Sequence, residues 1–248
     1  MAGHPVSGRL EESFLRKLVA AEVFITADSL SILDERSQQN AATAKVAFAA
    51  DKYAVLSDLL PRPQMAAMRQ YYRDYVENGF VPFGDGQVDR RYCEHNEVLA
   101  SYIHTQLLNI VSKVVGERLK LSYVYAAAYE DGSVLLPHID REQCEYSISF
   151  QVDFQPETDD NKSQWPIVVE PLSNFNTPLN ENNETFQWDK FDEITRIVEP
   201  TSILLASGDG LVYKGRELVH YRRELPLGQR STSLFSHFVA ANFEGRLH

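Results

Sequence analysis

Residues 145–154 read "EYSISFQVDF", and their alternation indicates the class of fold. Successive residues of a β-strand point to opposite faces of a sheet, so the apolar residues share one face while Ser147, Ser149 and Gln151 share the other. We expect the apolar face to pack against helices and the polar face to border water or a wet cavity. Further runs between residues 201 and 239, "TSILLA", "GLVYKG", "ELVHYRR" and "STSLFSHFV", predict more strands.

Before residue 119 the apolar residues recur at helical spacing instead. The pattern predicts helices over residues 9–24, 64–77 and 97–115, the last one ended by Gly116 and capped at its start by Asn96. A polar connection rich in Gln, Asn and Ala is expected after the first helix, ahead of a short strand in "YAVLSDLLP" that ends at a proline-punctuated turn.

Helices followed by a run of antiparallel strands predict an α+β chain whose strands form a sandwich or a barrel. We expect one domain over residues 1–248, with a mainly helical flank at 1–118 and a strand core at 119–243. Within that core, residues 155–198 are rich in Asn, Asp and Pro, which predicts a long loop.

Composition narrows the classes of function. The net charge of −11 argues against a nucleic-acid partner, because such proteins need a basic surface. No run approaches the roughly 18 apolar residues of a membrane span, and the first residues have no signal-peptide core, so we expect no membrane partner and a cytoplasmic location. Only Cys93 and Cys144 are present, so no disulfide framework is indicated.

The stretch "LLPHIDREQ", residues 135–143, holds the first candidate site residues. His138 and Asp140 are two apart, so on a strand both side chains share one face and can converge on one point. An imidazole and a carboxylate suit a divalent ion of borderline hardness such as Fe(II). A lone His-x-Asp is more often a core histidine beside a surface acid, so the pair needs a third ligand.

That third ligand is His220, near the end of a predicted strand. Nine residues separate it from Arg230, and we expect a hairpin of this length to bring the arginine back alongside the histidine. The guanidinium could then grip a carboxylate, with the hydroxyl of Thr232 or Ser231 beside it. Two histidines and one carboxylate form the facial triad of non-haem Fe(II) oxygenases, which leaves open positions on the metal.

With these spacings the chain resembles the Fe(II)/2-oxoglutarate-dependent dioxygenases, the superfamily that includes the prolyl hydroxylases. The resemblance covers about residues 120 to 240. It includes "WPIVVE", "GDGLVYKGRELVHYR" and a tyrosine nine residues before His138, which matches a cosubstrate-contacting tyrosine in prolyl-hydroxylase-like members. The residues that match the motif are His138, Asp140, His220, Arg230, Thr232 and Tyr129.

The resemblance implies a double-stranded β-helix, a jelly-roll or cupin-like barrel, with the N-terminal helices flanking it. It implies that His138, Asp140 and His220 hold Fe(II), and that 2-oxoglutarate binds the iron with its far carboxylate against Arg230, aided by Thr232 and Tyr129. O2 then takes the last open position. An unactivated C–H bond is hydroxylated, and succinate and CO2 are released.

A carboxylate at Asp140 favours hydroxylation over halogenation, because halogenating relatives carry a small residue there. Desaturation and ring formation use the same ligands and stay open. The expected substrate is a small molecule, such as an amino acid or a biosynthetic intermediate. The alternatives are a hydroxylase of protein or peptide side chains, which an open groove with an exposed loop would favour, and a non-catalytic barrel that binds a metal or ligand. A hydrolase using zinc-bound water would leave Arg230 unexplained.

Other polar residues keep two interpretations. Arg216 and Arg222 flank the distal histidine and either hold an anionic substrate or are solvated charges at the barrel rim. Ser149 and Gln151 either line the pocket or are structural. His237 has the opposite strand parity to Arg230 and is expected to point away from the iron.

Overall fold

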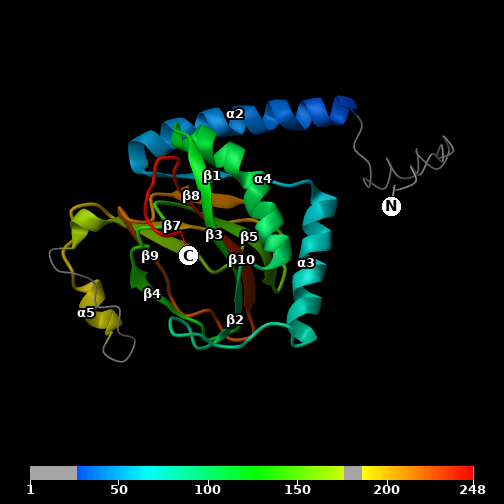
Figure 1. Cartoon of the computed structure of the whole chain (residues 1–248). Coiled ribbons are helices and arrows are strands. Elements are labelled where there is room, and N and C mark those ends of the chain that lie inside the picture. The colour runs from blue at the N-terminus through cyan, green and yellow to red at the C-terminus, as the bar shows by residue number, and fades with distance from the viewer. Residues whose placement is uncertain (1–26, 176–185, 248) are drawn as a thin grey trace. The chain divides into compact units, whose positions relative to one another are not determined.

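The computed structural model of the chain describes residues 27–175 and 186–247, with side chains from residue 38 onward (Figure 1). Residues 40–248 form one compact unit, and the fold below is that of this unit. Of the smaller unit, residues 1–39, only the start of helix α2 (Ala27–Asp51) is described. The helix predicted over residues 9–24 lies outside the described residues.

Helix α2 corrects the prediction of a polar connection. Its sequence is rich in Ala and Gln, which are good helix formers, and that propensity outweighs the absence of a strong apolar stripe. Ala41, Ala44 and Phe48 follow the spacing of one helical face and are buried in the core of the larger unit. The small alanine side chains let this part of the helix lie close to its neighbours.

The other two long helices match their predictions. Helix α3 (Arg62–Glu77) and helix α4 (Val98–Val115) pack against the strands of the larger sheet (Figure 1). Helix α4 ends at Gly116, whose φ of 85° is the left-handed conformation that glycine adopts readily. The prediction of Asn96 as its N-cap is wrong. Glu97 caps the helix, and its carboxylate accepts hydrogen bonds from the backbone N–H groups of Leu99 and Ala100.

The strands in the described residues form two antiparallel sheets. The larger has the order β1-β8-β5-β10-β3-β2, and the smaller has the order β4-β9-β6-β7. The strand bounds are β1 (Tyr53–Leu56), β2 (Arg91–His95), β3 (Leu119–Tyr129), β4 (Leu135–His138), β5 (Tyr146–Gln155), β6 (Ile167–Pro171), β7 (Thr201–Ile203), β8 (Gly210–Tyr213), β9 (Leu218–Arg222) and β10 (Arg230–Ala240). This arrangement confirms the predicted antiparallel sandwich or barrel.

The segment predicted as a long loop, residues 155–198, is partly ordered into regular structure. It contains strand β6, which fills the middle of the smaller sheet, a 3-10 turn (Leu172–Asn174) and helix α5 (Trp188–Asp192). Strand β6 is a short run of buried, mostly β-branched residues, whose burial on both faces hides the alternation expected of a strand.

The two faces of strand β5 border different parts of the protein. Its outward side chains, including Ile148 and Phe150, pack in the main core against α3 and α4. Its inward side chains, Ser147, Ser149 and Gln151, are fully buried between the sheets. The polar face therefore points into the barrel, as the alternation of residues 145–154 predicts.

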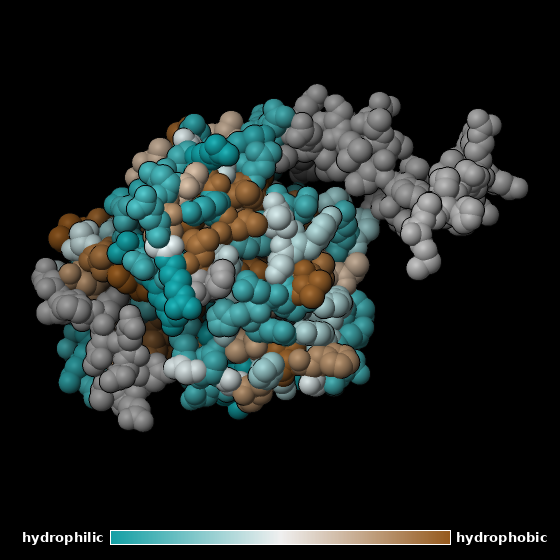
Figure 2. Space-filling view, in the orientation of Figure 1, coloured by the Kyte–Doolittle hydropathy of each residue, from teal (hydrophilic) through white to brown (hydrophobic). Residues whose placement is uncertain are grey.

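The surface of the unit mixes chemical types. Figure 2 shows hydrophobic residues interrupted by hydrophilic ones on the visible face. None of the helices in the described residues combines the length and apolar character that a bilayer crossing demands.

Candidate metal centre and active-site cavity

Two histidines from neighbouring strands of the smaller sheet face each other. His138 on β4 and His220 on β9 are direct partners in the strand register. Their ring centroids are 4.2 Å apart, so the side chains point to the same side of the sheet. Residues far apart in the sequence thus meet, as the resemblance implies.

Backbone carbonyls fix which nitrogen of each ring is free. The Nδ1 of His138 lies 2.7 Å from the carbonyl oxygen of Leu136, and the Nδ1 of His220 lies 3.1 Å from that of Leu218. A carbonyl only accepts, so each Nδ1 carries the proton and each Nε2 keeps its lone pair. Both histidines are set to bind a metal through Nε2.

Asp140 completes the group. Its Oδ1 lies 3.5 Å from the Nε2 of His220, and its Oδ2 accepts a hydrogen bond of 2.6 Å from the Ser147 hydroxyl. The ligand atoms of Asp140 and the two histidines all lie within 4.8 Å of one another. Its backbone N–H donates to the carbonyl of Gly215 at 2.8 Å, and Gly215 leaves the space that the carboxylate occupies.

His138 and Asp140 are in protonation states that can bind a metal. Burial, reinforced by His220, lowers the pKa of His138 to about 4, so its ring is neutral near pH 7. Burial alone would raise the pKa of Asp140, but the neighbouring His220 outweighs it and holds this pKa below its usual range. Two imidazoles and one carboxylate fit Fe(II), which takes this mixture of nitrogen and oxygen ligands.

A cavity of about 500 Å³ opens beside this group, between the two sheets. The smaller sheet contributes residues of β4, β6 and β9, and the larger sheet contributes residues of β2, β3, β8 and β10. Four tyrosines, Tyr123, Tyr125, Tyr129 and Tyr213, give it an aromatic lining with polar tips. Tyr129 was predicted from the sequence to lie in the site, and it lines this cavity.

Arg91 on β2 lines the cavity, in a segment (residues 90–97) whose sequence favours a helix entry over the alternative of substrate contact. The side chain is buried, and its Nε and Nη2 pair with Asp85 at 2.8 and 2.6 Å. Its Nη1 donates to the Tyr129 hydroxyl at 3.0 Å. Asp85 also accepts from Tyr125. Alternation in "RYCEH" was the available signal, since it places residues 91, 93 and 95 on one face.

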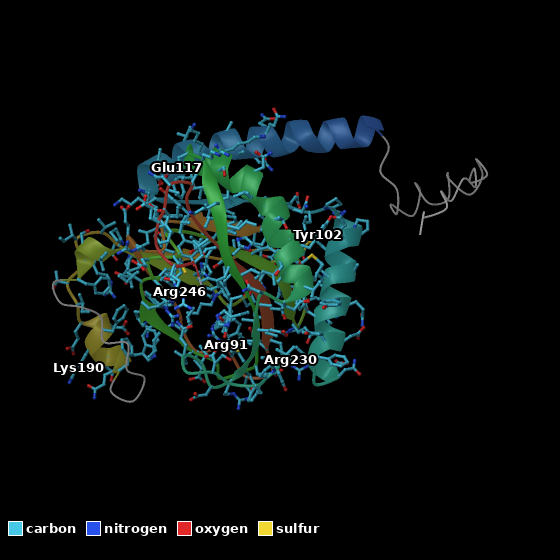
Figure 3. The ribbon with its side chains drawn as sticks, viewed as in Figure 1. Arg91, Tyr102, Glu117, Lys190, Arg230 and Arg246 are labelled. Atoms are coloured by element: carbon cyan, nitrogen blue, oxygen red, sulfur yellow. The ribbon has the colours of Figure 1, made fainter. Side chains whose placement is uncertain are left out.

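The structure places Arg230 and Thr232 outside the cavity. The Arg230 side chain is 55% exposed, and its Nε donates to Glu130 at 2.9 Å. The chain crosses from the smaller sheet to the larger one between β9 and β10, so these strands do not form the predicted hairpin. In the register of β10 with β3, Ser231 lies opposite Tyr129, which faces the cavity. Ser231 therefore points inward, and its neighbours Arg230 and Thr232 point outward. Arg91 and Arg230 are labelled in Figure 3.

The same register corrects the expectation for His237. It has the opposite parity to Arg230, as predicted, but this parity points it into the cavity. Its Nδ1 lies 2.8 Å from the Ser147 hydroxyl. Since that hydroxyl donates its proton to Asp140, the His237 Nδ1–H is the donor in this second bond.

The remaining candidates separate clearly. Arg216 is exposed in the turn between β8 and β9, away from the cavity. Ser149 and Gln151 are buried on the inner face of β5, behind the cavity lining. Arg222 is 1% exposed and lies on the same face of β9 as His220, so it is not a rim charge.

Arg222 has an unusual environment. Its guanidinium carbon lies 4.6 Å from the ring centre of Trp165, and its Nη1 donates to the Trp165 carbonyl. Its Nε has no hydrogen-bond partner among the described residues, and no carboxylate in that part of the chain pairs with it. Burial lowers the pKa of Arg222 to about 10, so the group still carries its charge near pH 7.

Comparison with known proteins supports the fold. No family model matches the chain, and no curated protein matches it in sequence. Among solved structures, the α-ketoglutarate-dependent epimerase SnoN from nogalamycin biosynthesis matches with a TM-score of 0.61 at 12% identity, over 81% of each chain. A prolyl hydroxylase from Trichoplax adhaerens, in complex with a peptide of hypoxia inducible factor, matches with a TM-score of 0.60 at 10% identity, over 86% of this chain and 94% of that one.

A third structure is HygX from Streptomyces hygroscopicus with nickel, 2-oxoglutarate and hygromycin B bound. It matches with a TM-score of 0.55 at 16% identity, over 88% of this chain and 89% of that one. Identities this low speak for the fold alone. The chain has the double-stranded β-helix fold of the Fe(II)/2-oxoglutarate oxygenases.

Proposed function

We propose that this protein is an Fe(II)- and 2-oxoglutarate-dependent oxygenase that hydroxylates a small molecule. One observation carries the proposal: in a fold shared with such enzymes, His138, Asp140 and His220 converge at the edge of an internal cavity, with both Nε2 atoms and a carboxylate oxygen directed together. A barrel that only stores a ligand does not require this ligand set.

The residues of the chain divide the work. His138, Asp140 and His220 would hold the iron, and the carbonyls of Leu136 and Leu218 orient the two rings. The Ser147 hydroxyl donates a hydrogen bond to the Asp140 carboxylate, and the Gly215 carbonyl accepts one from the Asp140 backbone N–H, so both fix the position of Asp140. When bound, iron and 2-oxoglutarate supply the oxidising chemistry for a C–H bond, with release of succinate and CO2.

The reaction type is part of the proposal. The carboxylate of Asp140 fills the position that halogenation would need free, which favours hydroxylation. Proteins of similar fold catalyse other reactions: SnoN is an α-ketoglutarate-dependent epimerase and SnoK an α-ketoglutarate-dependent carbocyclase. The proposal of hydroxylation therefore rests on Asp140 and on the resemblance, and product analysis decides it.

The cavity supports a small-molecule substrate. Its volume of about 500 Å³ falls within the roughly 300–1,000 Å³ typical of small-ligand pockets. Similar structures include one with hygromycin B bound and one with a peptide, so the fold alone does not choose between a small molecule and a peptide. Peptide hydroxylation is the alternative, and a cytoplasmic location remains a prediction.

The test is succinate release by the purified protein. With Fe(II), 2-oxoglutarate and oxygen, a panel of amino acids, small biosynthetic intermediates and peptides is screened for stimulated succinate and for a product heavier by one oxygen. Asp140→Ala, which lacks one metal ligand, is the matched control. We expect stimulation in the wild type and none in the variant. Equal succinate from both proteins would contradict the assignment of the metal centre.

A further inference from the structure

We infer that Arg222, and not Arg230, binds the carboxylate at the end of 2-oxoglutarate that lies away from the metal. This inference rests on the proposed function and deepens it, because it moves the cosubstrate anchor from strand β10 to strand β9. The sequence motif of the Fe(II)/2-oxoglutarate-dependent dioxygenases assigns this role to the position of Arg230.

The Arg222 guanidinium is a buried charge without a counterion among the described residues. Arg222 is 1% exposed, and in the described part of the chain no carboxylate pairs with it. Taking an isolated cation out of water is costly, so buried arginines are normally paired with an anion. Stacking on Trp165 and one hydrogen bond to its carbonyl offset only part of that cost. The unused Nε is a donor still in need of an acceptor.

The position of Arg222 relative to His220 suits the length of 2-oxoglutarate. Arg222 follows His220 by two residues on β9, so the side chains share a face, and their Cα atoms are about 7 Å apart along the strand. This separation is comparable with the distance between the two ends of 2-oxoglutarate. Leu135, the register partner of Arg222, lines the cavity, so the Arg222 side chain lies on the cavity face of the smaller sheet, directly behind the lining residues.

The hydroxyl of Tyr129 can donate a second hydrogen bond near Arg222. Its hydroxyl accepts a hydrogen bond from Arg91, which leaves the phenolic proton available for another acceptor. Tyr129 and Arg222 both lie against Trp165, whose ring centre is 4.9 Å from that of Tyr129 and 4.6 Å from the guanidinium carbon of Arg222. Arg91 is already neutralised by Asp85, so of the two buried arginines near this tyrosine it is Arg222 that lacks an anion among the described residues. A carboxylate between Tyr129 and Arg222 would satisfy both.

Charge balance points to a dicarboxylate. A divalent ion bound with the single negative charge of Asp140 leaves one positive charge at the metal, and Arg222 adds a second one further in. A ligand with two carboxylates matches both centres. Arg230 offers no comparable site, because its side chain is 55% exposed and bonded to Glu130 on the outer face.

The experiment compares two acids on the holoprotein. The protein is loaded with Ni(II), which avoids turnover, and the affinities for 2-oxoglutarate and 2-oxopentanoate are measured by calorimetry. 2-Oxopentanoate has the same metal-binding end but a methyl group in place of the far carboxylate, so the ratio of the two affinities reports that carboxylate alone. Fluorescence of Trp165, which lies against Arg222, provides a second binding signal.

We expect the wild type to prefer 2-oxoglutarate. Arg222→Met should weaken 2-oxoglutarate binding about 10- to 100-fold, because a charged hydrogen bond is lost, and should leave 2-oxopentanoate binding unchanged within about threefold. Arg230→Met, the matched control, should keep the wild-type preference. Metal-free Arg222→Met should unfold at a temperature no lower than the wild type, since the variant removes an unpaired buried cation. A residue with only a structural role would lower it.

Each other result has a definite meaning. If Arg230→Met loses the preference while Arg222→Met keeps it, the inference is overturned and the proposed function stands. If the Ni(II)-loaded wild type does not distinguish the two acids, the proposed function itself fails. Should Arg222→Met not fold, Arg222→Lys takes its place. It keeps the charge but not the bidentate geometry, so we expect the preference to fall at least about tenfold, and an unchanged preference overturns the inference.

Discussion

Gly215 lies where any side chain would collide with Asp140, the proposed metal ligand. A Cβ built on Gly215 would lie 2.1 Å from the Asp140 Oδ2 and 2.7 Å from the carbonyl oxygen of Cys144, whereas ordinary van der Waals contact begins at 3.4 Å. The backbone conformation of Gly215 is open to other residues, since its φ is not in the left-handed region. The effect of Gly215→Ala is therefore steric.

We expect Gly215→Ala to weaken metal binding about 10- to 100-fold, the range seen when groups that orient metal ligands are lost. To restore ordinary contact, the carboxylate would have to retreat by about 1.3 Å, whereas metal–ligand distances tolerate only about 0.2 Å. The crowding should also cost about 1–3 kcal/mol of unfolding free energy. The fold should survive, because the turn between β8 and β9 can relax outward.

The assay is anaerobic competition for Fe(II) against a colorimetric chelator, with denaturant unfolding of the same samples. Gly86→Ala is the matched control, because Gly86 also lines the cavity but a Cβ there meets nothing within 4 Å. It should bind metal as the wild type does. If Gly215→Ala binds Fe(II) within twofold of the wild type, Asp140 does not hold the metal in the observed position.

Three further substitutions test other parts of the structure. Arg196→Met should destabilise the fold by about 3–5 kcal/mol, because it leaves the Glu170 carboxylate, whose side chain is 0% exposed, without its cation; denaturant titration measures this, and a loss below about 1 kcal/mol would contradict it. Ser147→Ala should weaken Fe(II) binding about tenfold by freeing one oxygen of Asp140, and equal affinity in the chelator assay would refute that role. Glu97→Gln should cost about 0.5–2 kcal/mol at pH 7, because the carboxylate caps α4. Burial alone would raise the pKa of Glu97, but hydrogen bonds from backbone N–H groups and tyrosines lower it overall. The contribution of Glu97 to the free energy of unfolding is therefore full above the unfolded pKa near 4.5 and is lost as the pH falls through the lower folded pKa. A stability difference between wild type and variant that grows on acidification would contradict this.

The sequence predicted the parts of the site that depend on residue identity and strand parity within one strand. His138 and Asp140 are two residues apart, and His220 lies in the run "ELVHYRR" that the sequence predicts as a strand, so their convergence followed once the fold was inferred. Arg222 shares the parity of His220, but its burial could not be known, because charged residues of this kind are usually found at barrel rims.

Features that depend on tertiary pairing were not accessible. The inward or outward direction of Arg230 depends on the crossing from one sheet to the other between β9 and β10, and no local signal marks such a crossing. Arg91 lies in the half of the chain expected to be mainly helical, and strand β2 joins the barrel only by pairing with β3. Helix α2 was missed because its sequence lacks a strong apolar stripe.

The two sheets contribute different things to the cavity, and this has a consequence for how the protein can change. The three proposed metal ligands come from β4, the residues just after it, and β9 of the smaller sheet, whereas Tyr123, Tyr125 and Arg91 belong to the larger one. Substitutions at these three positions can therefore reshape the space offered to a substrate without disturbing the proposed iron ligands, unlike a substitution of Ser147 on β5, which bonds to Asp140. Directed evolution toward new substrates should start from those positions, where altered selectivity need not come at the expense of metal loading.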